Sequence, residues 1–142
     1  MSVVTIKGRS ITGGVAEGEA MVTKQAFGFS HGLDPASGRI SDESHEWLGQ
    51  DAKGKVLVFT YGKGSTSGGL YILEAAKRGN LPTAVICLEA DPVAAGGFIM
   101  AELLYGATIP VIDRPDKNPT DLIKPGDRVR VDADKGTIEI HR

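Results

Sequence analysis

A glycine-rich turn between two regular segments constrains the fold of this chain more than any other feature. The turn covers residues 62–69 and reads Gly-Lys-Gly-Ser-Thr-Ser-Gly-Gly. It follows an apolar run at 55–60 and precedes a helix-like run at 70–78, after which a second apolar run covers 83–88. This pattern predicts a strand–turn–helix–strand unit over residues 55–88, with parallel strands joined by a right-handed crossover.

The helix after the turn has signals at both ends. Thr66 or Ser67 can serve as its N-cap, because a side-chain oxygen at that position accepts from a free backbone N–H group. Gly79 suits the left-handed position that ends many helices, and Pro82 follows soon after. We therefore expect a helix that begins within the turn and ends before Gly79.

A second helix is predicted over residues 92–105. Asp91 precedes it as an N-cap, a proline occupies its first position, and Gly106 follows its end. Glu102 is its only charged residue, so the helix is apolar nearly all round. Such a helix either lies at the centre of the core or turns one face toward a partner subunit, and both readings stay open. The glycine pair at 96–97 weakens the helix and is a candidate position for a break.

Short strand-like runs make up much of the remaining chain. They are expected at residues 3–6, 18–23, 109–112, 129–132 and 137–140. The last two runs alternate apolar and polar residues around a turn, which is typical of a hairpin. Residues 27–49 show little periodicity, and a loop of that length within a compact domain is often functional. The chain is thus predicted to be one α/β domain over residues 1–142, rich in β-structure, with an embedded βαβ unit.

Composition excludes several classes of function. The net charge is −2 with both signs interspersed, so no nucleic-acid partner is expected. No apolar stretch reaches the ~20 residues that span a bilayer, so no membrane partner is expected either. The first residues lack the basic start and long apolar centre of a signal peptide, and we expect a cytoplasmic protein.

Cysteine and histidine are too scarce to build a metal site of the usual kind. Cys87 is the only cysteine and lies within an apolar strand-like run, so we expect a buried apolar side chain there. One thiolate cannot hold an iron–sulfur cluster. The histidines, at positions 31, 45 and 141, are far apart in the sequence. We expect no metal ligands in this chain, so most ligands of any metal it works with should come from another chain.

Familiar glycine-rich motifs do not fit the turn. A P-loop needs a serine or threonine directly after its lysine, but Gly64 follows Lys63. A dinucleotide-binding fingerprint needs glycine where Ser67 stands. The same residue breaks the Gly-x-Ser-x-Gly pattern of hydrolases. The turn is therefore a hydroxyl-rich segment of a different kind.

Ser65 is the candidate for chemistry in this turn. Backbone N–H groups at a helix start, the helix dipole and Lys63 are suited to stabilising an alkoxide on its side chain. Gly64 leaves room for a ligand to approach the backbone closely. The alternative is that the three hydroxyls of residues 65–67 only cap the helix. A further alternative is a non-catalytic module whose turn binds a carboxylate or phosphate.

The chain resembles the small subunit, or swivel domain, of aconitase X over most of its length. The matching segments are residues 13–20, 29–35, 55–59, 62–68 and 126–131. The resemblance implies a swivelling β/β/α fold with a barrel-like core. It also implies a heteromeric or fused hydro-lyase, in which the partner is a large subunit that holds an iron or iron–sulfur centre through cysteines. This chain would then bind no cofactor and would be inactive alone.

The resemblance also implies roles for the residues of the turn. Ser65 corresponds to the catalytic serine of the family, which as an alkoxide removes a proton from the carbon next to the substrate carboxylate. Gly64, Thr66 and Ser67 would bind substrate oxygens. Lys63 would either stabilise the alkoxide or face solvent. The reaction is a β-elimination of water from a small hydroxy acid.

The substrate is predicted from one segment. Family members dehydrate cis-3-hydroxy-L-proline or, in archaea, mevalonate 5-phosphate. Residues 101–111 form a longer stretch than the archaeal pattern has, which favours cis-3-hydroxy-L-proline, with mevalonate 5-phosphate as the alternative. The chain also departs from the family at Ser30 and His31, where an aromatic–glycine pair is usual, so a substrate role is not carried over to these two residues.

Overall fold

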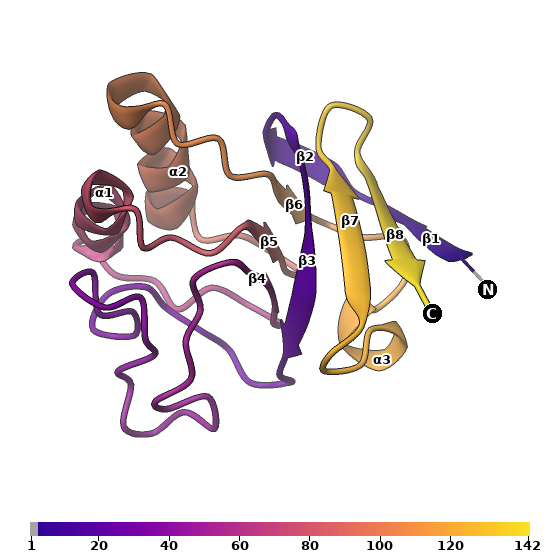
Figure 1. The fold of residues 1–142 in the computed structure, drawn as a ribbon, viewed down its shortest axis with the longest axis horizontal. Helices are drawn as coiled ribbons and strands as arrows, with labels where there is room; N and C mark the ends of the chain where they lie inside the picture. The colour runs from indigo at the N-terminus through magenta and orange to yellow at the C-terminus, as the bar shows by residue number, and fades with distance from the viewer. Residues whose placement is uncertain (1–2) are drawn as a thin grey trace.

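A mixed eight-stranded sheet organises the computed structural model, which describes residues 3–142 (Figure 1). The strand order is β1-β8-β7-β3-β4-β5-β6-β2. The strands are β1 (Val3–Lys7), β2 (Arg9–Thr12), β3 (Val15–Val22), β4 (Lys55–Val58), β5 (Ala84–Ile86), β6 (Val111–Asp113), β7 (Arg128–Asp132) and β8 (Thr137–His141). Strands β3, β4, β5 and β6 are parallel, and antiparallel strands flank them on both sides.

The predicted βαβ unit is confirmed. Strands β4 and β5 pair in parallel with Val56 opposite Ala84, and α1 (Gly68–Arg78) connects them. The helix ends at Gly79, which has the left-handed backbone expected of a C-cap, with φ of 72°. Ser67 occupies the N-cap position, but its side chain makes no capping hydrogen bond. Its hydroxyl is therefore free for other contacts.

The second predicted helix, α2 (Pro92–Tyr105), is also confirmed. The Asp91 carboxylate caps it by accepting from the Ala94 backbone N–H group at 3.0 Å. The predicted break at residues 96–97 is wrong, since the helix is continuous. A Cβ at Gly97 would lie 2.9 Å from the Cα of Gly69 in α1. Glycine at this position instead allows the two helices to pack closely.

Helix α2 lies on the outside of the molecule beside α1 (Figure 1). Its inner side buries Phe98 and Ala101, so the reading as a central core helix is wrong. Six large apolar side chains on the helix are exposed, Leu103 by 73%, and four of the six lie between residues 99 and 104. We call this set the outer face of α2: Ile99, Met100, Leu103 and Leu104. The contact with a partner subunit, expected from the sequence, stays a prediction.

The sheet separates two hydrophobic cores. Side chains of β4 alternate between them, with Leu57 in the core under the helices and Val56 in the core on the other face. The segment 27–49, predicted as an aperiodic loop, is irregular but contributes to the helix-side core. Its buried apolar side chains are Phe27, Phe29, Leu33, Ile40 and Trp47. The loop is thus held in place by burial.

Strand β2 and the short helix α3 (Pro119–Leu122) were not predicted from the sequence. Strands β1 and β2 stand at opposite ends of the strand order, yet only Gly8 separates them in the chain. The sheet must therefore curl until its two edges approach each other. Over residues 3–142 these two strands do not pair with one another, so the predicted barrel-like core is not confirmed. None of the described helices is long and apolar enough to cross a membrane.

Candidate functional site

The glycine-rich turn lies at the carboxyl end of the parallel strands. It follows β4, Asp91 follows β5, and Arg114 follows β6, so residues distant in the sequence share one edge of the sheet. This edge is where open α/β sheets most often bind ligands. The sequence placed the turn correctly, since the strand before it and the helix after it are both present.

A second segment runs beside the turn and completes the site. Phe27 and Gly62 form a parallel bridge. The backbone N–H of Phe27 donates to the carbonyl oxygen of Tyr61, and that of Lys63 donates to the carbonyl oxygen of Phe27, each at 3.1 Å. The buried Phe27 ring anchors this pairing in the core. The residues just after Phe27 are thereby brought beside the hydroxyls of the turn.

Three serine hydroxyls and an imidazole follow one another at the start of α1. Ser65 Oγ lies 3.3 Å from Ser67 Oγ, which lies 2.5 Å from Ser30 Oγ. Ser30 Oγ in turn lies 3.1 Å from His31 Nδ1. The backbone N–H of Ser67 donates to Ser65 Oγ at 3.4 Å. We call Ser30, Ser65 and Ser67 the hydroxyl cluster.

The remaining predicted site residues differ in what they contact. Gly64 and Thr66 are both exposed. A Cβ on Gly64 would meet only Asp91 Oδ1, at 3.8 Å, so the space beside the backbone there is open. The structure brings Ser65 and Ser67 together and leaves Gly64 and Thr66 available to a ligand.

Lys63 is held by a residue that the sequence did not indicate. Its Nζ lies 3.3 Å from Asp42 Oδ2, in an ion pair. Hydrogen bonds from the hydroxyl and backbone N–H of Ser44, together with Lys63, lower the pKa of Asp42 to about 2. Asp42 therefore stays ionised at neutral pH. The Lys63 side chain is half exposed, and among the described residues its Nζ pairs with Asp42 and makes no hydrogen bond to Ser65. Its role toward Ser65 stays a prediction.

Ser30 and His31 are the site residues that the sequence indicated only as a departure from the family. His31 has a left-handed backbone with φ of 59°, an uncommon conformation for a residue other than glycine. Its ring centroid lies 5.1 Å from that of Tyr71, in the first turns of α1. Their place beside the turn depends on the Phe27 pairing, which no sequence periodicity indicates.

The described side chains do not fit an iron centre. Over residues 3–142, no group of three or more histidine, cysteine, aspartate or glutamate side chains is placed to hold a metal ion. Cys87 is buried as expected, and burial, with the nearby Asp113 and Glu89 carboxylates, raises the pKa of its thiol to about 12. His45 is also buried, and its Nδ1 accepts from the backbone N–H of Trp47.

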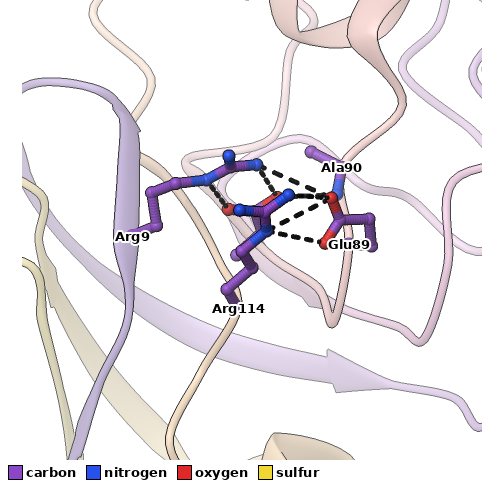
Figure 2. A network of polar contacts seen from close by, with 5 residues as sticks. Arg9, Glu89, Ala90 and Arg114 are labelled. Carbon is purple, nitrogen blue, oxygen red and sulfur yellow. Dashed lines mark hydrogen bonds and ion pairs between the residues drawn. The ribbon is translucent and has the colours of Figure 1, made fainter.

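A second polar cluster lies at the same edge of the sheet (Figure 2). Two nitrogens of Arg9 donate to the buried Asp113 carboxylate at 2.8 Å each, and the Ala90 backbone N–H donates to it at 2.9 Å. Arg114 pairs with Glu89 at 3.0 Å. Burial opposes ionisation of Asp113, but the bonds from Arg9 and Ala90 lower its pKa below the usual value. We call this set the arginine–carboxylate cluster.

Comparisons with known proteins agree on one family. The aconitase X swivel domain matches residues 5–140. The phosphomevalonate dehydratase small subunit of Methanosarcina acetivorans is 39% identical over 137 residues, covering 96% of this chain and 91% of the relative. The protein of the same name from Methanocella arvoryzae is 42% identical over 135 residues, covering 95% and 98%.

Solved structures give the same result. The crystal structure of Thermococcus kodakaraensis aconitase X in its holo-form has a TM-score of 0.88 and 40% identity, covering 98% of this chain and 99% of that one. The solution structure of a UPF0107 protein has a TM-score of 0.86 and 39% identity, covering 98% and 100%. The family match and these full-length similarities lead to one conclusion: the chain belongs to the aconitase X swivel domain family.

Proposed function

We propose that this chain is the small subunit of a dehydratase that removes water from mevalonate 5-phosphate. Its relatives from Methanosarcina, Methanocella and Thermococcus carry the name phosphomevalonate dehydratase small subunit, at 38–42% identity over nearly the whole chain. The prediction of cis-3-hydroxy-L-proline, made from the length of residues 101–111, remains unconfirmed. The names of the relatives favour the alternative.

The observation that supports chemistry in this chain is the surroundings of Ser65. Its half-buried hydroxyl sits at the start of α1, next to the Ser67 hydroxyl and the Ser67 backbone N–H group. Hydrogen-bond donors and the positive end of a helix dipole stabilise an anion at such a place. In the proposed reaction, ionised Ser65 Oγ takes the proton from the carbon next to the substrate carboxylate, and the hydroxyl group leaves from the neighbouring carbon.

Other residues of the turn bind and orient the substrate in this proposal. Gly64 leaves open space beside its backbone, and Thr66 presents an exposed hydroxyl. Lys63 provides a positive charge at the edge of the site, with its position set by Asp42. A substrate with a carboxylate and a phosphate suits a site that offers several N–H and O–H donors beside the Lys63–Asp42 ion pair.

A large subunit is the proposed partner, and the outer face of α2 is the proposed contact. The name small subunit implies a large one in the relatives. Exposed apolar side chains gathered on one helix are typical of a protein interface. Because the described side chains do not fit an iron centre, we assign any such centre to the large subunit, and we expect the small subunit alone to be inactive.

The proposal is tested by producing the chain together with the large subunit and assaying dehydration of both candidate substrates. We expect turnover of mevalonate 5-phosphate, and in Ser65→Ala a loss of kcat of about 10²–10⁴-fold, the range that a positioned general base contributes. Ser37→Ala is the matched control. Its hydroxyl bonds to Asp34 in a separate turn, so its turnover should match the unaltered complex.

Three results would contradict parts of the proposal. Full turnover by Ser65→Ala would show that Ser65 is not the base. Turnover of cis-3-hydroxy-L-proline alone would restore the first prediction of the substrate. Binding of mevalonate 5-phosphate by the unaltered complex without turnover would identify a binding module in place of an enzyme.

A further inference from the structure

We propose that His31 receives the proton of Ser65 through a relay of two hydroxyls, those of Ser67 and Ser30. The inference rests on the proposed function, since it explains how Ser65 becomes an alkoxide. Serine is a weak acid, so an alkoxide base needs a group that accepts its proton. His31 acts through other residues and does not need to touch the substrate.

The relay is carried by consecutive contacts in the structure. The distances along it are 3.3 Å from Ser65 Oγ to Ser67 Oγ, 2.5 Å to Ser30 Oγ and 3.1 Å to His31 Nδ1. Each hydroxyl can accept one hydrogen bond while donating another, which is the property that a proton relay requires. The chain ends at an imidazole, the side chain best suited to exchanging a proton near neutral pH.

Two simpler roles for these groups do not fit the contacts around them: capping of the helix by Ser67, and stabilisation of Ser65 by Lys63. Ser67 occupies the N-cap position of α1, but its side chain makes no capping hydrogen bond, so its hydroxyl is not used to stabilise the helix. Lys63 is the nearest cation in the sequence, and its Nζ is paired with Asp42. Within residues 3–142, the side-chain contacts of Ser65 lead to Ser67 and onward to the imidazole.

The backbone and ring of His31 are both held in place. Its φ of 59° is a conformation that costs free energy for a side chain other than glycine, and such strain is often found at functional sites. The hydroxyl of Ser41 donates to the His31 carbonyl oxygen at 2.8 Å, and the ring packs near Tyr71. These contacts keep Nδ1 toward Ser30, while the exposed side of the residue faces solvent.

Every proton that moves along the relay is accounted for within one turnover. Ser65 gives its proton to Ser67, Ser67 gives its own to Ser30, and Ser30 gives its own to His31 Nδ1. This leaves an alkoxide and an imidazolium. The alkoxide then takes the proton from the substrate carbon, and hydroxide leaves. The exposed imidazolium releases one proton, which together with the hydroxide makes the water that is lost.

The first test determines the tautomer of His31 and does not depend on enzymatic turnover. The relay requires neutral His31 to accept at Nδ1, so its proton must lie on Nε2. Two-bond ¹⁵N–¹H NMR spectra of the labelled small subunit in complex with the large subunit distinguish the two tautomers. We expect the Nε2–H form. A neutral Nδ1–H form would overturn the relay, whatever the complex does with a substrate.

The second test compares variants of the complex. Asparagine tolerates a left-handed backbone and keeps an acceptor for Ser30, but it cannot take up a proton, so His31→Asn removes only the end of the relay. We expect kcat to fall about 10²-fold, with KM changed by less than about twofold, and added imidazole to restore part of the rate. Ser30→Ala should lower kcat similarly. The double variant should be no slower than either single one, because both interrupt the same relay.

The pH profile separates a proton acceptor from a structural residue. The acid limb of kcat, where protonated His31 cannot accept, should disappear in His31→Asn. The other titratable groups around this ring are Asp34, Glu43 and Tyr71, which line the same surface hollow. Glu43→Gln, outside the relay, is the control and should keep both the rate and the acid limb.

These results distinguish failure of the relay from failure of the proposed function. If Ser65→Ala is inactive while His31→Asn keeps the full rate and the acid limb, the relay is wrong and the serine base stands. If Ser65→Ala is fully active, the proposed base is wrong and the relay fails with it. If both variants lose activity and the Nε2–H tautomer is observed, both proposals are supported.

Discussion

Two polar clusters at the same edge of the sheet are built in opposite ways. The arginine–carboxylate cluster pairs opposite charges around the buried Asp113, which accepts from Arg9 and from the Ala90 backbone. The hydroxyl cluster contains neutral groups, half-buried, each able both to donate and to accept. The first cluster satisfies its charges internally. The second leaves proton-transfer capacity beside open space at Gly64.

The difference suggests that the arginine–carboxylate cluster stabilises the fold and that the hydroxyl cluster serves the reaction. A buried carboxylate that accepts from both sides fixes the first residue of β2, the last residue of β6 and the segment that precedes α2. Removing it should affect folding. Hydroxyls that satisfy no cap and no buried charge contribute little to folding, so removing them should affect turnover. Each of the following predictions challenges this division.

The largest effect on stability is expected for Asp113→Ala. The change leaves the Arg9 guanidinium and the Ala90 N–H group without their shared acceptor. We expect the free energy of unfolding to fall by about 2–4 kcal/mol in urea titrations, less than for a fully enclosed pair because Arg9 is partly exposed. Glu89→Ala, at the exposed end of the cluster, should cost much less because solvent screens that ion pair. Equal losses for the two variants would contradict the role of burial.

The opposite pattern is expected for Ser67→Ala. Its hydroxyl makes no capping bond, so the free energy of unfolding should change by less than about 0.5 kcal/mol. The kcat of the complex should fall about 10²-fold, because the Ser67 hydroxyl that lies between Ser65 and Ser30 is lost. A stability loss above about 1 kcal/mol with unchanged kcat would show that the serine serves the helix after all.

A third substitution lies outside both clusters, on the outer face of α2. Leu103 is 73% exposed, so Leu103→Glu should barely alter the stability of the chain itself. If this face meets the large subunit, a buried charge there should weaken the complex by about 10–100-fold, measured by titration calorimetry. Glu102→Gln, on the same helix, serves as the control. Unchanged affinity in Leu103→Glu would place the interface elsewhere.

The smallest effect concerns pH and the loop beside the hydroxyl cluster. Burial lowers the pKa of His45, and its Nε2 has no hydrogen-bond partner among the described residues. The unfolded chain therefore binds a proton that the folded chain resists, and stability should decline as pH falls below about 6.5. His45→Asn keeps an acceptor for Trp47 and should flatten this decline, followed by urea titrations between pH 7 and pH 5. His31→Asn, an exposed site, should leave it intact.

Local signals made the centre of the fold predictable. The glycine-rich turn, Asp91 with its following proline, and the stops at Gly79 and Gly106 each act within a few residues, and both helices formed where they indicated. Strand β2 was missed because the sequence Arg-Ser-Ile-Thr is short and three of its four residues are polar. The aromatic residues of 27–49 were missed as core because their burial follows no period.

Only the part of the candidate site that lies within the glycine-rich turn could be predicted from the sequence. Ser65 and Ser67 belong to one turn, so their proximity follows from the sequence. Ser30 reaches them only because Phe27 pairs with Gly62, a contact that depends on burial of an aromatic ring in the helix-side core. The Lys63–Asp42 ion pair likewise joins residues from two loops. Long-range packing determines these contacts, and a single sequence carries no direct signal of it.

Gly8 bears on how far the two edges of the sheet are exposed to other molecules. An open sheet presents two edges, each with unpaired backbone groups to which strands of other molecules can add. Here both edge strands are short and meet at Gly8, where a Cβ would lie 2.6 Å from Ile112 Cγ2 and 2.7 Å from the Asp113 carbonyl oxygen. Any larger side chain would collide with β6 at this corner of the chain. A single hydrogen atom as side chain thus keeps both edges close to the body of the molecule, away from strands of its neighbours.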